Sequence, residues 1–129
     1  MDIELNGHSY KCGTIDARKQ FHIVRRLAPV MGSVAKGGEA LDSIASAIGK
    51  LSDEDADYVI FGLLACVTRK QENGLGWAKV SNGNAMMFSD ISMADMIQLA
   101  YRAFEANMQD FFAVIRSTLK EQQQPQNAL

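Results

Sequence analysis

The side chains of this sequence that would most readily supply a nucleophile or a general base are two cysteines and two histidines, Cys12, Cys66, His8 and His22. They are far apart in the chain, and no Cys-x-x-Cys, His-Glu-x-x-His or paired His–Cys spacing joins any of them into a metal or redox motif. Cys66 lies in the most apolar stretch, where a thiol is usually an inert core residue. We therefore predict a protein that is not an enzyme and that uses no cofactor and no metal.

Methionine and aromatic residues gather in the last third of the sequence. Methionine is flexible and polarisable, so it fills irregular gaps in a core, which is its commoner role, and it also adapts to apolar partners. The second role would suit a surface that covers hydrophobic segments of another chain, or of a second copy of this chain in a homo-oligomer. The candidate partner-binding residues are Met86, Met87, Phe88, Met93, Met96, Ile97, Tyr101, Phe104, Met108, Phe111 and Ile115.

A helix is the element that must position most of these residues. Ser92 can cap its N-terminus, and apolar side chains recur every three or four positions from Ile97 to Leu119, without an intervening Gly or Pro. The pattern predicts one helix over about residues 92–122, or two shorter helices with a break between residues 107 and 110. Such a stripe must be covered by this chain or by another one.

Charge is unevenly distributed along the first half of the chain. Residues 11–36 hold six basic residues and one acidic residue, whereas residues 39–57 hold six acidic residues and one lysine. Solvated helix faces are the simpler interpretation, and opposed patches that orient a partner or pair subunits head to tail are the alternative. The candidate basic patch consists of Arg18, His22, Arg25 and Arg26. A net charge of −2 makes nucleic acid an improbable partner.

The first helix of the chain is predicted to begin at Thr14 or Asp16. Pro29 lacks a backbone donor, so the helix kinks or stops there. Phe21 and Leu27 belong to its apolar stripe and are expected in the core. The arginines and His22 occupy the rest of its circumference and are expected to point outward.

Two more helices precede the methionine-rich region. The first covers about residues 39–48 and ends at Gly49. The second begins at Ser52, contains the apolar stretch Tyr58–Val67 and is predicted to be the central buried helix, with the cations of residues 68–70 near its C-terminus.

Two hairpins complete the predicted fold. Alternating polar and apolar residues on both sides of Asn6-Gly7 predict an N-terminal β-hairpin with a type I′ turn. Residues 77–80 and 85–88 are the predicted arms of a second hairpin around a four-residue loop. The fold class predicted is α+β, mainly α-helical, with four or five helices, an N-terminal β-hairpin and a second small hairpin.

The length of 129 residues fits one globular domain over residues 1–121, followed by a disordered Gln-rich tail over residues 122–129. The longest apolar run is about half the length that a membrane span needs. The first residues are acidic, where a signal peptide would be basic. Two cysteines do not make a disulfide framework. A cytoplasmic protein is expected, with no membrane partner.

A family resemblance is carried by the N-terminal third. The alternating stretch from Ile3 to Lys11 leads into Gln20-Phe21-His22, followed by Arg25-Arg26-Leu27 and Pro29. This part resembles the small tail assembly chaperones of long-tailed bacteriophages and prophages, in which a short hairpin precedes a helix with a similar Q-F-H-x-x-R-R-L-x-P run. The resemblance covers about the first 30 residues well and the helical remainder only in general character. It includes no catalytic motif.

The resemblance implies a non-catalytic role in virion assembly. Such chaperones bind the long, aggregation-prone tape measure protein, keep it soluble in the bacterial host cytoplasm, can recruit tail tube protein around it, and are absent from the finished particle. The alternatives are a structural tail or connector component and, with less support, a small nucleic-acid-binding regulator. The sequence leaves the oligomeric state, the binding surface and the existence of a longer frameshifted form open.

Overall fold

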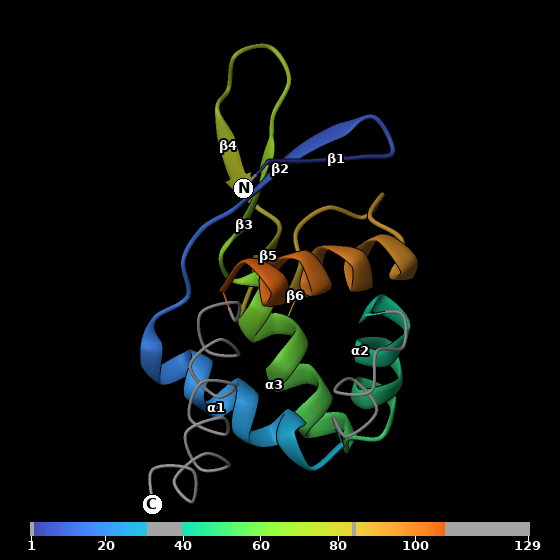
Figure 1. Cartoon of the computed structure of the whole chain (residues 1–129). Coiled ribbons are helices and arrows are strands. Elements are labelled where there is room, and N and C mark those ends of the chain that lie inside the picture. Colours follow the sequence, from blue (N-terminus) through green and yellow to red (C-terminus); the bar gives the residue numbers. More distant parts are fainter. Residues whose placement is uncertain (1, 31–39, 84, 108–129) are drawn as a thin grey trace, which may run out of the picture.

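The chain folds into a small antiparallel sheet packed on helices (Figure 1). A computed structural model describes residues 2–30, 40–83 and 85–107, except for the side chains of residues 40–44. The described elements are β1 (Asp2–Leu5), β2 (His8–Cys12), α1 (Ala17–Leu27), the 3-10 helix η1 (Ala28–Val30), α2 (Ala40–Gly49), α3 (Asp53–Leu64), β3 (Val67–Lys70), β4 (Trp77–Lys79), β5 (Ser81–Asn82), β6 (Ala85–Met86) and a helix that begins at Met93 and is described through Asn107. The predicted α+β class is confirmed.

The N-terminal hairpin forms as predicted. Asn6 and Gly7 have φ angles of 51° and 81°, which is the left-handed backbone that a type I′ turn requires. Ile3 lies opposite Tyr10 in the β1–β2 register, and both side chains are buried. One face of this hairpin therefore belongs to the core.

The helix starts also follow the sequence. Asp16, Ser52 and Ser92 each accept a hydrogen bond from the backbone N–H three residues further on, at 2.9–3.1 Å, and so cap α1, α3 and the 93–107 helix. α1 ends at Leu27, and η1 contains Pro29, which has no donor to continue the helix.

One prediction about α1 is wrong. Phe21 was expected in the core, but its side chain is 57% exposed, whereas Ile23 and Leu27 are fully buried. The buried pair is spaced by four residues and so lies on one face of the helix. That face packs closely on α3, because a Cβ atom at Gly62 would lie only 3.1 Å from Ile23 Cδ1.

Strand β3 was not predicted. The sequence analysis continued the buried helix to Val67 and placed the following cations at its C-terminus, but α3 ends at Leu64 and β3 pairs with β2 and β4. Gly13 N donates to Cys66 O at 2.8 Å, so the chain leaving α3 joins the edge of β2 directly. The backbone N–H and C=O groups of the residues after α3 thus find their hydrogen-bond partners in the sheet and not in a longer helix.

The second hairpin exists, but its first arm was misplaced. Residues 77–80 were assigned to it, whereas β4 pairs with β3 and the hairpin is formed by β5 and β6. Positive φ angles at Asn73, Gly74 and Gly76 let the chain reverse between β3 and β4. Sequence alternation located the strands here without revealing their partners.

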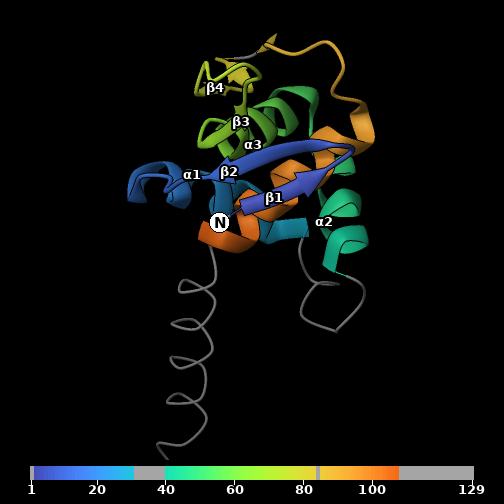
Figure 2. The same ribbon diagram turned by 90° about the horizontal axis from the view of Figure 1, so that it is seen from above.

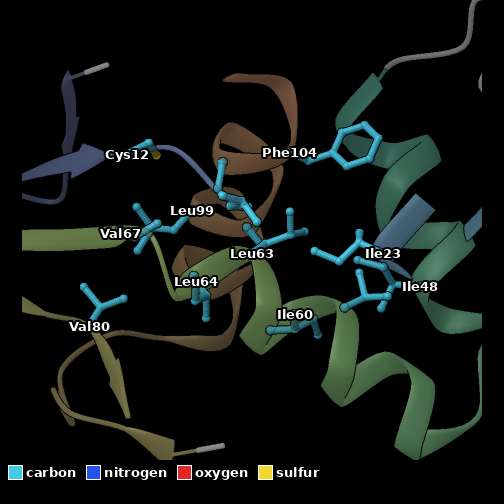
Figure 3. Packing of buried hydrophobic residues seen from close by; sticks show 14 of the residues in the cluster. Cys12, Ile23, Ile48, Ile60, Leu63, Leu64, Val67, Val80, Leu99 and Phe104 are labelled. Carbon is cyan, nitrogen blue, oxygen red and sulfur yellow. The ribbon is translucent and has the colours of Figure 1, made fainter. Parts of the chain in front are cut away.

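The core lies between the sheet and the helices, with α3 at its centre. Figure 3 shows Val67 and Val80 at the strand side, Leu63 in the middle and Ile48 on the far side. Seen from above, β1 and β2 pass over the 93–107 helix (Figure 2). The predicted central position of the Tyr58–Val67 stretch is confirmed for its helical part.

Candidate functional site

The thiols lie close to one another where β2 meets the end of α3. Burial, with a smaller contribution from the nearby Cys66, raises the pKa of Cys12 to about 11. Burial also raises the pKa of the Cys66 thiol, whose Sγ donates to Leu63 O at 3.3 Å. Both groups are therefore protonated at neutral pH, which makes them weak nucleophiles.

The two histidines lie on different elements. His8 Nε2 is 3.3 Å from Asp90 Oδ2, and desolvation together with the charge of Arg25 lowers the pKa of His22 on α1. In the part of the chain that the structure describes, no three His, Cys, Asp or Glu side chains are grouped as metal ligands would be. None of the helices found there has the length and apolar character needed to span a membrane.

The predicted partner-binding residues have very different exposures. The most exposed are Met93 and Met87, with exposed fractions of 77% and 56%. Residues that are half-buried against the core are Met86, Phe88, Met96, Ile97 and Tyr101. The remaining predicted residues, Met108, Phe111 and Ile115, lie outside the described part of the chain.

Phe104 requires a correction. Its side chain is 4% exposed and belongs to the core, together with Leu99, Ala100 and Ala103 of the same helix. This face of the 93–107 helix is covered by the chain's own sheet and helices (Figure 3). As the chain is folded, Phe104 is not accessible to a partner.

Two shallow grooves adjoin the β4–β5 segment, and the exposed Met87 lines one of them. One, of about 440 Å³, is lined by Gln71, Ala78, Lys79, Ser81, Asn82, Met87 and Phe88. The other, of about 450 Å³, runs along α3 and is lined by Lys19, Glu54, Asp57, Tyr58, Phe61, Gly62, Ala65, Lys79, Ser81, Asn82 and Gly83. The grooves share three residues of the β4–β5 segment, so they lie on its two sides.

Arg69 fixes the segment that carries Met87 and Phe88. Its guanidinium donates to both carboxylate oxygens of Asp90, at 2.8 and 3.0 Å, and its carbon lies 4.3 Å from the centre of the Phe88 ring. The hydrogen bonds from Arg69 lower the pKa of Asp90 below its usual value and keep the carboxylate charged. Sequence analysis missed this role because it placed Arg69 at a helix end.

The candidate basic patch is only partly available. Arg18 and Arg25 are exposed on α1, and His22 is half-buried with its ring 5.3 Å from that of the exposed Phe21. Arg26 is engaged within the chain, since its Nε donates to Asp55 at 3.1 Å and its guanidinium carbon lies 3.8 Å from the Tyr58 ring centre. Arg26 thus joins α1 to α3.

Among the described residues, the exposed large hydrophobic side chains outside the predicted set are those of Phe21, Leu75 and Trp77, with exposed fractions of 57%, 70% and 38%. Alternation in residues 77–80 indicated a strand, but only the pairing of β4 with β3 decides which way Trp77 points.

Comparison with known protein families identifies a match over most of the chain. The model of the family described as "Phage tail assembly chaperone protein, TAC" matches residues 6–120. No curated protein and no solved structure matches the chain.

Proposed function

Because the chain belongs to the phage tail assembly chaperone family, we propose that it binds the phage tape measure protein and keeps it soluble during tail assembly in the host cytoplasm. The role is non-catalytic binding. It requires an apolar surface on a folded domain that can adapt to a long, irregular client.

The exposed pair Met87 and Met93 is the observation that carries this proposal. These two large apolar side chains remain in contact with water in the folded chain. Their flexibility allows them to pack on apolar groups of varied shape. The groove beside Met87 adds Ala78 and the ring of Phe88 to the same surface.

The surface is also held in a defined position. The Arg69–Asp90 contact anchors the chain two residues after Phe88, and the Ser92 cap starts the 93–107 helix immediately afterwards. A site positioned in this way loses less conformational entropy on binding than a mobile loop would.

A double substitution tests the proposal. The variant Met87→Asp with Met93→Asp, co-expressed with the tape measure protein of the same phage, is expected to leave that protein in the insoluble fraction. The matched control is Ser89→Asp with Gln98→Asp, which adds the same charge at exposed polar positions nearby. Circular dichroism of the purified variants shows whether both fold. A folded methionine variant that solubilises the client as well as wild type does would refute the assignment.

Purified virions separate this function from that of a structural tail or connector component. An assembly chaperone leaves the tail before it is complete, so mass spectrometry of purified particles should not detect the chain. Its presence at a constant copy number per particle would favour the structural role.

A further inference from the structure

The face of the four-stranded sheet that points away from the core gathers positive charge around one tryptophan. The strand registers pair Lys70 with Trp77 and place Lys11, Thr68 and Lys79 in one row across β2, β3 and β4. Side chains alternate between the two faces of a strand, so all five lie on the same face. The helices lie on the other side of β1 and β2 (Figure 2).

Trp77 offers an open apolar surface at this place. Its side chain is 38% exposed although Lys11 Nζ lies 4.4 Å from the ring centre. Leu75, which is 70% exposed, lies in the connection between β3 and β4, and this connection extends beyond the rest of the described fold (Figure 1). Together they form an apolar anchor at a projecting edge.

The surrounding lysines are not neutralised. Lys11, Lys70 and Lys79 are exposed, and none of them forms an ion pair with another described residue. Three like charges around one ring repel one another, and carboxylates brought by a ligand would remove that repulsion. The Trp77 platform is the name used below for Lys11, Lys70, Trp77, Lys79 and Leu75.

We propose that the Trp77 platform binds an acidic, amphipathic segment of a partner protein. Carboxylates of the segment contact the three lysines, and an apolar side chain packs on Trp77 and Leu75. Desolvated contact with an exposed tryptophan is typical of the residues that dominate binding energy at protein interfaces. The lysines supply orientation and a faster encounter.

The same face favours a protein ligand over a nucleic acid. Asp2 and Glu4 lie on it in β1, so the positive charge is confined to the β2–β4 part of the face, where a short acidic segment would fit. Surfaces that bind single-stranded nucleic acid stack successive bases on several aromatic rings, and this face has only Trp77 among its described side chains.

This inference goes beyond the proposed function, because the platform does not include Met87 or Met93, and the two surfaces meet only at Lys79, which also lines the groove beside Met87. It adds a second surface with a different chemistry. A chaperone with both could hold an apolar stretch at the methionines and an acidic stretch at the sheet, in one client or in two.

Trp77 is the single tryptophan of the chain, so its fluorescence reports directly on the platform. The full-length protein is titrated with a synthetic peptide of glutamate and leucine, with a counterpart in which lysine replaces glutamate, and with a single-stranded thymidine oligonucleotide. We expect the acidic peptide alone to shift the Trp77 emission, with an affinity that falls as salt rises.

Substitutions then assign the site. Replacing Lys11 and Lys70 together by Gln leaves Lys79 and the groove beside Met87 unchanged. This change should weaken binding of the acidic peptide by about fivefold, which corresponds to the loss of two exposed charge contacts. The matched control is Lys50→Gln, an exposed lysine between α2 and α3, and the Met87→Asp, Met93→Asp variant should bind this peptide as wild type does. Tighter binding of the oligonucleotide, equal binding of both peptides, or no emission change at all would each overturn the proposal, without bearing on the methionine surface.

Discussion

The 93–107 helix and the outer face of the sheet use large side chains in opposite ways. The helix has the stronger apolar pattern in sequence, yet its Leu99 and Phe104 are 0% and 4% exposed. The sheet has a weaker pattern, yet it leaves Trp77 open among unpaired lysines. An apolar stripe in the sequence therefore indicates that one face of an element must be covered. Whether the same chain or a partner covers that face depends on the fold.

Two leucines provide the sharpest test of this contrast. Leu99→Ala removes a fully buried side chain and should lower the free energy of unfolding by about 2–5 kcal/mol, because it leaves a cavity. Leu75→Ala, at a side chain 70% exposed, should change it by less than about 0.5 kcal/mol. Urea denaturation of both variants measures the difference. Equal effects would mean that the helix face is not internal.

A smaller loss is expected at Asn107, which attaches the same helix to the start of α1. Its side-chain oxygen accepts from Ile15 N at 2.7 Å and its amide donates to Gly13 O at 3.2 Å. Asn107→Ala leaves the partly buried N–H group of Ile15 without this acceptor and should cost about 1–3 kcal/mol. The exposed Asn82, changed to Ala, is the control in the same denaturation experiment. A neutral result at Asn107 would contradict the attachment.

The contact of Arg69 with Asp90, which joins β3 to the segment before the 93–107 helix, should depend on pH. Arg69 lowers the pKa of Asp90 below its usual 3.8, so the stabilising contribution is present above that value and is lost as the pH falls through the lower, folded-state pKa. Asp90→Asn should therefore lower stability slightly at neutral pH, with a smaller deficit in acid, because the contact is exposed to solvent. Asp57→Asn, at an exposed residue of α3, is the control for loss of one charge. A deficit that stayed constant down to the acid range would exclude this ionisation as its cause.

The smallest effect is expected on α1, where the same contrast appears between neighbouring arginines. Arg26→Gln removes the contacts with Asp55 and Tyr58 and should destabilise by about 0.5 kcal/mol. Arg25→Gln should be neutral, because Arg25 is exposed. Thermal unfolding measures the loss of stability in each variant. A larger loss for Arg25→Gln than for Arg26→Gln would show that the packing of α1 on α3 is misassigned.

Local sequence patterns were enough to predict several turns and helix ends. The turn at Asn6-Gly7, the caps at Ser52 and Ser92 and the stop at Pro29 each depend on residues within one or two turns of the chain, and each is found in the structure. The placement of Phe21 could not be predicted in the same way. Its side chain and that of Ile23 are both apolar, and only the position of α3 decides which is buried.

The candidate site was predictable in part. Methionine enrichment drew attention to residues 86–93, where Met87 and Met93 are exposed, but it did not separate them from the core residue Phe104. Trp77 and its lysines were not singled out, because β3 was taken as the end of a helix and its partners were unknown. Because β3 was not predicted, the Trp77 platform could not be recognised from the sequence.

The sequence by itself determined where helices begin, where the chain turns and, through its N-terminal run, the family to which the chain belongs. These features depend on backbone preferences and on neighbours close in the chain. The tertiary structure alone decided that residues 67–70 form the strand between β2 and β4, and hence which side chains are covered. Strand pairing and burial depend on backbone hydrogen bonds and contacts between residues far apart in sequence, which no local pattern specifies.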